Sequence, residues 1–130
     1  MSEYGDVAAR AVELIGQGKC SSPVSAWKAA AAKVLSTPSM QKKVCPKNTF
    51  LGLCEAGLVI GIPSGEYGNP LQNKEYALKA IKILTHTPEM KEDKARLWKA
   101  VTGGGKTHNS QMDVVVRLWN DGSLVNMKEQ

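Results

Sequence analysis

The sequence predicts an all-α fold, a single compact domain over residues 1–130 with five or six short helices and little or no sheet. Apolar residues recur at helical spacing in most segments of the chain. Ser22-Pro23 and Thr87-Pro88 each have the pattern of a helix cap followed by a first-turn proline. The aromatic content is only 5%, which leaves a core of mainly small aliphatic residues and favours closely packed helices.

The longest mainly apolar stretch, residues 44–63, is the segment on which the other helices are expected to pack. It contains the only phenylalanine and two of the three cysteines. Pro46 suits the first position of a helix, and Gly57 suits the position just past a helix end. We therefore predict a short buried helix, followed by a tight apolar segment that stops at Pro63.

Two helices are expected before this stretch. Residues 6–15 place their apolar side chains on one helical face, and the glycines that follow would end that helix. The second helix is expected over residues 23–35, with Ser22 as its cap. Residues 36–39 predict a loop or a new cap, and residues 40–44 fit no single structure.

A long loop and two more helices are expected after the apolar stretch. Residues 64–73 are rich in Gly, Pro and Asn, which predicts the longest irregular loop. A helix is expected from residue 73 or 74 to about residue 84. Another is expected over residues 88–101, and the triple glycine 103–105 would stop it.

Residues 110–125 are compatible with either a helix or a hairpin. Apolar side chains in residues 110–119 have helical spacing, and Ser110 would be the cap. However, Val114-Val115-Val116 is β-branched, and a hairpin-type turn follows it. We favour a helix, because no second strong strand is available for pairing. Residues 125–130 are expected to be frayed.

Composition excludes several classes of protein. The N-terminus has no secretory signal, and no apolar run approaches the ~18–20 residues of a membrane span. We therefore expect a cytoplasmic protein without membrane contact. The three cysteines form no Cys-x-x-Cys pair, which suits reduced thiols, and only two histidines are present. We expect neither a metal site nor a cofactor.

The net charge of +5 indicates an anionic partner, either nucleic acid or an acidic protein. Lys42, Lys43 and Lys47 lie in a stretch without acidic residues and are the nucleic-acid candidates. A second group of lysines lies in residues 74–82. The plainer interpretation is a solvated surface with excess lysine, since only three of the 17 positive residues are arginine.

Residues 100–107, Ala-Val-Thr-Gly-Gly-Gly-Lys-Thr, resemble a P-loop with alanine in place of the first glycine. That motif requires a strand before the loop and an acidic strand elsewhere to hold Mg²⁺. Here a predicted helix comes first, and no upstream segment offers a buried parallel strand. The sequence therefore favours a glycine-rich linker between helices over nucleotide hydrolysis.

Residues 108–113 are the densest polar cluster. His108, Asn109 and Asp113 are candidate catalytic residues, and Ser110 and Gln111 are candidate ligand-binding residues. A helix N-terminus here would also favour an anion. The plainer alternative is that Asn109 or Ser110 caps the helix, while Gln111 and Asp113 face water.

Cys45 is the remaining catalytic candidate. At a helix N-terminus beside Lys47, its thiol would be favoured as the nucleophilic thiolate, and Lys47 and Asn48 would contact a ligand. With His108 as base and Asn109 or Asp113 as orienter, a Cys-His-Asn arrangement can be drawn. This requires the two segments to meet, so we predict that the helices starting at Pro46 and Ser110 pack side by side.

The structural alternative for this stretch makes Cys45 a small buried thiol and Cys54 a core residue. Glu55 would either face solvent or pair with Lys47. The three tryptophans are expected to anchor helices rather than to stack on bases, because each lies on an apolar helical stripe.

Three blocks carry a resemblance over nearly the whole chain: residues 45–61, 73–80 (Asn-Lys-Glu-Tyr-Ala-Leu-Lys-Ala) and 108–115 (His-Asn-Ser-Gln-Met-Asp-Val-Val). The sequence resembles an uncharacterised family of small bacterial proteins. That family has no assigned activity, so the resemblance supplies no catalytic residues. It implies a bacterial, stand-alone, cytosolic protein.

Two functions remain open at this point. The first, which we favour, is a non-enzymatic binding module that acts on nucleic acid, an anionic ligand or a protein partner. The second is a small cysteine-dependent enzyme that uses Cys45 with residues 108–113.

Overall fold

The computed structural model describes residues 3–125, and within them the fold is helical, as predicted. The elements, in chain order, are α1 (Glu3–Gly16), α2 (Pro23–Val34), α3 (Pro38–Gln41), α4 (Val44–Glu55), α5 (Leu71–His86), the 3₁₀ helix η1 (Pro88–Glu92), α6 (Lys94–Thr102) and α7 (Gln111–Asn120). Six of the α-helices in this range have nine or more residues. The β-structure described is one isolated antiparallel bridge, between Val59 and Leu124.

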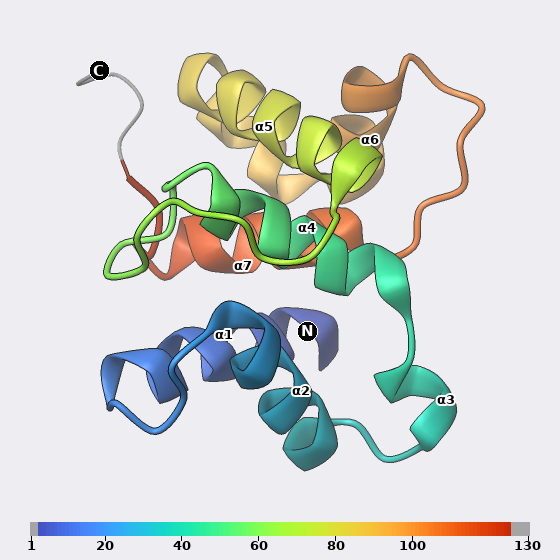
Figure 1. Cartoon of the computed structure of the whole chain (residues 1–130). Coiled ribbons are helices and arrows are strands. Elements are labelled where there is room, and N and C mark those ends of the chain that lie inside the picture. Colours follow the sequence, from blue (N-terminus) through green and yellow to red (C-terminus); the bar gives the residue numbers. More distant parts are fainter. Residues whose placement is uncertain (1–2, 126–130) are drawn as a thin grey trace.

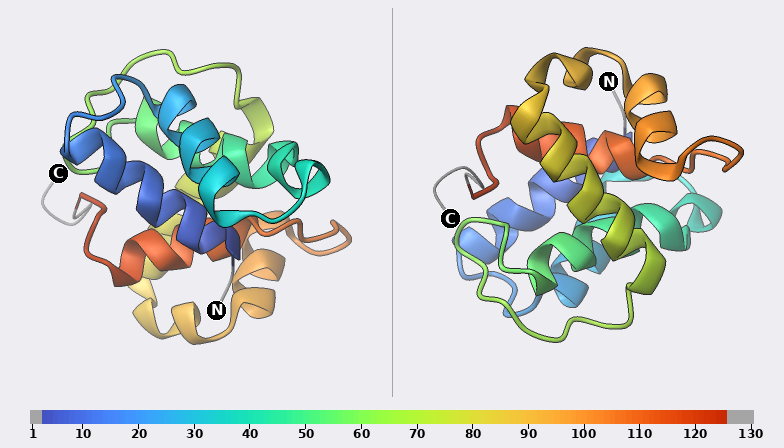
Figure 2. Two further views of the ribbon diagram at one scale, coloured as in Figure 1. Left: turned by 90° about the horizontal axis from the view of Figure 1, so that it is seen from below. Right: turned by 90° about the horizontal axis from the view of Figure 1, so that it is seen from above.

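The helices form three layers around α4 and α7 (Figure 1). α4 and α7 lie side by side in the middle layer, α1 and α2 pack on one side, and α5 and α6 pack on the other. α4 and α7 also run in the same direction, so that their N-termini lie at the same end of the molecule (Figures 1 and 2). The predicted side-by-side packing of the central and last helices is therefore confirmed.

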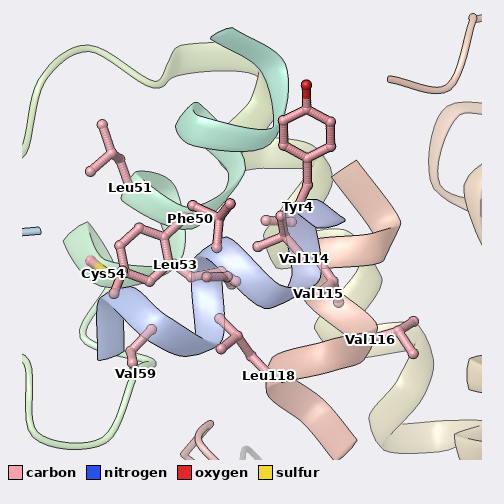
Figure 3. Close-up of a cluster of buried hydrophobic side chains, with 14 of the residues drawn as sticks. Tyr4, Phe50, Leu51, Leu53, Cys54, Val59, Val114, Val115, Val116 and Leu118 are labelled. Atoms are coloured by element: carbon pink, nitrogen blue, oxygen red, sulfur yellow. The ribbon is translucent and has the colours of Figure 1, made fainter. Parts of the chain in front are cut away.

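The predicted burial of the central helix is also confirmed. Every residue from Thr49 to Cys54 is buried, so that part of α4 is covered on all sides. Figure 3 shows Phe50 and Leu53 in the cluster of buried hydrophobic side chains that also contains the valines of α7. Phe50 also stacks on Trp27 of α2, with ring centroids 5.5 Å apart. This tryptophan anchors its helix as expected.

The sequence predicts the end of α4 correctly but not its start. The helix ends as predicted: Gly57 has φ +73°, and the amides of Gly57 and Leu58 donate to the carbonyls of Cys54 (3.0 Å) and Leu53 (3.1 Å). This pair of bonds is a Schellman motif, which requires the left-handed conformation that glycine adopts without strain. The predicted start at Pro46 is wrong by two residues, because α4 already begins at Val44.

Gly52 sets how closely α4 and α5 approach. A Cβ atom at this position would lie 2.6 Å from the Cα of Lys74, well inside van der Waals contact. Only glycine therefore allows the two helices to cross at this distance. No local sequence signal identifies this contact, because Lys74 lies on a different helix.

The first half of the chain follows the predicted order with two corrections. The Oγ of Ser22 caps α2 by accepting from the amide of Ser25 (3.2 Å), as expected. Residues 36–39 contain a new cap, one of the two predicted alternatives: Thr37 caps the short helix α3, which extends into the ambiguous stretch 40–44. α1 begins at Glu3 rather than at residue 6, because tertiary contacts hold its first turn: the hydroxyl of Tyr4 donates to the carbonyl of Met40 (3.0 Å).

The predicted helix over residues 88–101 is wrong as a single element. Pro88 opens the 3₁₀ helix η1, and α6 starts separately at Lys94. The break occurs at Asp93, whose carboxylate accepts from the amide of Arg96 (3.0 Å) and caps the new helix. Likewise, α5 starts at Leu71, earlier than the predicted residue 73 or 74.

The last described element resolves the choice between helix and hairpin in favour of the helix. Its three consecutive valines are buried because α7 packs against helices on several sides. Gly103 ends α6 at φ +81°, so the triple glycine is a linker between α6 and α7, as predicted. The predicted fraying concerns residues 125–130, of which all but Val125 lie outside the described residues.

Candidate functional site

His108 caps α7, which corrects the predicted cap at Asn109 or Ser110. The Nε2 atom of His108 accepts a hydrogen bond from the amide of Met112 (3.0 Å), so the imidazole is neutral and carries its proton on Nδ1. Ser110 occupies the N-cap position, as predicted, but it has the left-handed conformation (φ +67°) and its side chain makes no capping bond, so His108 supplies the acceptor instead.

An aromatic stack holds the His108 ring in place. The ring lies 5.3 Å from that of Trp98, and Trp98 packs edge-on against Tyr76 at 5.1 Å. The indole nitrogen of Trp98 donates to the carbonyl of Lys106 (2.8 Å), which fixes the linker just before the histidine. The stack therefore joins α5, α6 and the linker, and the buried Trp98 anchors its helix as predicted.

Burial lowers the pKa of His108 below its ordinary value of 6.5. The positive charge of Lys94 lowers this pKa further, and the carboxylate of Asp113 opposes the shift. Burial and the hydrogen bond to Met112 therefore favour the same neutral form. The Nε2 lone pair is occupied by the capping bond, so His108 cannot accept a proton there without releasing the cap.

Gln111 and Asp113 do not face water, contrary to the plainer prediction. Gln111 is only 3% exposed; its Oε1 accepts from the amide of Asn109 (2.6 Å), and its Nε2 donates to Oδ1 of Asn73 (3.3 Å). Asp113 forms an ion pair with Nζ of Lys94 at 2.7 Å. The polar cluster thus ties α7 to α5 and α6. The partners Asn73 and Lys94 were not identified from the sequence, since both are far from the cluster along the chain.

Cys45, Lys47 and Asn48 lie in the first turns of α4 and are half-buried. Thr49 donates to the carbonyl of Cys45 (2.8 Å). Within residues 3–125, no hydrogen bond or ion pair joins these three residues to residues 108–113, although both helix starts lie at the same end of the molecule. A shared pocket between them stays a prediction.

The other two polar candidates of α4 have structural roles. Cys54 is fully buried, and burial raises the pKa of its thiol, which keeps it protonated in the core as expected. Glu55 accepts from the amide of Tyr67 (2.9 Å) and pairs with Lys74 (3.0 Å) rather than with Lys47. The Tyr67 amide and the Lys74 ammonium lower the pKa of Glu55.

The strongest charge asymmetry lies in α2, α3 and the start of α4. Residues 14–54 contain six lysines and no acidic residue, whereas the remaining residues carry 11 basic and 12 acidic side chains. Five of these lysines define what we call the lysine-rich region: Lys28, Lys33, Lys42, Lys43 and Lys47. The first four are exposed, and none of the five pairs with a carboxylate among the described residues.

A hollow of about 360 Å³ lies between α1, η1, α6 and α7, and charged side chains of both signs line it. Lys94 pairs with Asp113 there, and Arg117 pairs with Asp6 and with Asp121 (3.0 Å). Lys91 and Glu92 also line this hollow, so positive and negative side chains are mixed there, whereas the lysine-rich region lies in a stretch with no acidic residue.

Residues 3–125 contain neither a membrane-spanning helix nor a metal-binding cluster. No helix in this range is both long enough and apolar enough to cross a membrane. No group of three or more His, Cys, Asp or Glu side chains in the same range is arranged to hold a metal ion.

Comparison with known protein families gives a match over most of the chain. Residues 1–125 match the family of unknown function DUF6979, which confirms the resemblance to an uncharacterised family. No curated protein and no solved structure matches the chain.

Proposed function

The chain belongs to the DUF6979 family, whose function is unknown, and we propose from its own surface that it is a non-enzymatic module that binds nucleic acid through the lysine-rich region. The observation that carries the proposal is the acid-free run of residues 14–54, which holds all of the excess positive charge. A phosphate backbone is the partner that such a surface attracts most strongly.

The lack of acidic residues distinguishes this region from the other lysines: residues 14–54 contain none, whereas the rest of the chain carries 12. Lys74 and Lys94 each bond to a carboxylate within 3.0 Å, so much of their field is neutralised locally. Lys28 and Lys33 of α2, and Lys42 and Lys43 just after α3, have no such partner among the described residues and are exposed. Their charges therefore add to one positive field that steers a polyanion to this side of the molecule.

The cysteine-dependent enzyme has less support. The Nε2 atom of His108 is engaged by the Met112 amide, and the carboxylate of Asp113 is engaged by Lys94. Activation of Cys45 by His108 and Asp113 would require both of these contacts to break. A binding module needs no such rearrangement.

Fluorescence anisotropy with labelled DNA and RNA tests the proposal. We expect binding at low salt, with an affinity that falls by a log–log slope of about −0.9 per phosphate contacted on duplex DNA. The triple variant Lys42→Glu, Lys43→Glu, Lys47→Glu should lose most of this binding. The matched control changes Lys79, Lys82 and Lys99 to Glu; these exposed lysines of α5 and α6 give the same change in net charge.

Absence of binding to any duplex or single strand at low salt would overturn the proposal and leave an acidic protein as the partner. Equal losses in the two triple variants would show that only the overall charge matters, which also contradicts a role for the lysine-rich region. Circular dichroism of each variant, with the helical spectrum of the wild type, ensures that a loss of binding is not a loss of folding.

A further inference from the structure

We infer that the nucleic acid is a duplex contacted through its backbone, and that one of its phosphates sits between Lys28 and Lys42 in the cavity between α2 and α3. The inference rests on the proposed function and specifies it, because it names the class of nucleic acid and the position of one contact.

The cavity is a defined feature of the lysine-rich region. Its volume is about 210 Å³, several times the ~30 Å³ that a water molecule occupies in the liquid. The side chains that line it come from α2 and α3 and include no acid: Lys28, Ala31, Pro38, Gln41 and Lys42. Two lysines, one on α2 and one at the C-cap of α3, thus line one concave site, and together they can neutralise a single phosphate group.

The backbone on both sides of the cavity is fixed before any ligand arrives. Thr37 caps α3 through the amide of Met40 (3.2 Å), and the side chain of Gln41 donates to the carbonyl of Leu35 (3.3 Å), the residue that ends α2. The hydroxyl of Tyr4 holds the Met40 carbonyl from α1. The two lysines therefore start from anchored Cα positions, and a phosphate has to order only their side chains.

The aromatic residues of this region argue for a duplex over a single strand. Proteins bind single strands largely by stacking bases on exposed aromatic rings. The only aromatic residues within 14–54 are Trp27 and Phe50, which are 2% and 0% exposed and stack on each other in the core. The region can therefore contact phosphates but cannot stack bases, which favours the partner with more phosphates per length. Duplex DNA carries one charge per ~1.7 Å of axis, against ~3.4 Å for each strand alone.

The type of cation indicates that binding is independent of base sequence. All positive residues of the region are lysines, which act as point charges, whereas arginine supplies the two-pronged contact to guanine. We therefore expect similar affinities for duplexes of different sequence.

The experiment compares two double variants on a mixed-sequence duplex and on each of its strands. Lys28→Gln with Lys42→Gln removes the cavity cations. Lys79→Gln with Lys82→Gln is the control, because these lysines line a different hollow on α5 and give the same change in charge. The wild type should bind the duplex more tightly than either strand. The slope of log K against log salt should become shallower by about 0.9, one phosphate, in the first variant only.

The outcomes separate this inference from the proposed function. Equal affinity for duplex and single strands, with the lysine-rich region still required, would overturn the inference and leave the proposed function intact. An unchanged slope in the first variant, or an equal change in both, would overturn the cavity contact. No binding at all would overturn both proposals.

A competition experiment with inorganic phosphate completes the test, since a free anion could also occupy the cavity. We expect phosphate to compete with the duplex no better than chloride at equal ionic strength. Saturable binding of phosphate alone that is lost in the double variant Lys28→Gln, Lys42→Gln would instead identify a small-anion site. That result would contradict the inference that a duplex phosphate occupies the cavity.

Discussion

Replacement of His108 by alanine tests the interpretation of residues 108–113 as a structural cluster. The change removes the acceptor for the Met112 amide and the ring that packs on Trp98 at 5.3 Å. A helix cap contributes about 0.5–2 kcal/mol and an aromatic pair about 0.5–1.5 kcal/mol. We therefore expect the free energy of unfolding to fall by roughly 1–3 kcal/mol at neutral pH.

The pH dependence follows from the direction of the His108 pKa shift. The folded protein holds this pKa below 6.5, so the unfolded chain binds the proton more tightly. The capping contribution is therefore complete above pH 6.5 and decreases as the pH falls from 6.5 towards the lower pKa of the folded state. The stability difference between wild type and His108→Ala should shrink over that window.

Urea unfolding followed by tryptophan fluorescence at several pH values measures this difference. His86→Ala is the matched control, because His86 is the only other histidine, is exposed, and makes no hydrogen bond to a described side chain or amide. Its replacement should change the unfolding midpoint little. A His108→Ala protein as stable as the wild type at neutral pH, or a stability difference independent of pH, would refute the capping role.

Two other predictions concern the core and the thiols. Gly52→Ala should destabilise the protein by about 1–3 kcal/mol in chemical unfolding, because its Cβ would lie 2.6 Å from the Lys74 backbone. Gly16→Ala, where nothing lies within 4 Å, should be neutral or slightly stabilising, and equal effects at the two sites would contradict the close helix contact. Iodoacetamide should modify Cys45 no faster than the half-buried Cys20, and should reach the buried Cys54 only on unfolding. Rapid modification of Cys45 that becomes slower in His108→Ala would instead support the cysteine-dependent enzyme.

Local signals predicted the parts of the fold that local chemistry determines. Ser22 caps α2 where the serine–proline pair indicated a start, and Gly57 ends α4 in the left-handed conformation expected of it. The buried core of α4 followed from its apolar composition. These features depend on residues close together in the chain, so the sequence pattern contains them.

Features that depend on partners distant in the sequence were missed. His108 replaces Ser110 as the cap because Trp98 holds its ring beside α7, and Glu55 pairs with Lys74 rather than with the nearer Lys47. No periodicity identifies such pairs, since they arise only when helices pack. The break at Asp93 was missed for a different reason. The apolar side chains keep helical spacing across it, but the Asp93 carboxylate accepts from the Arg96 amide and so starts a new helix.

The candidate interface was predictable in part. The lack of nearby acids identifies Lys42, Lys43 and Lys47, and the same criterion extended to residues 14–54 adds Lys19, Lys28 and Lys33. That Lys28 and Lys42 line one cavity could not be inferred from sequence, because it depends on how α3 folds back against α2.

Backbone amide chemical shifts, recorded by NMR during titration with a short duplex, test the central claim most directly. We predict progressive, salt-sensitive shifts for residues of α2, α3 and the first turn of α4, with little change in α5 and α6. Shifts spread evenly over all helices, or none at low salt, would contradict nucleic-acid binding through the lysine-rich region.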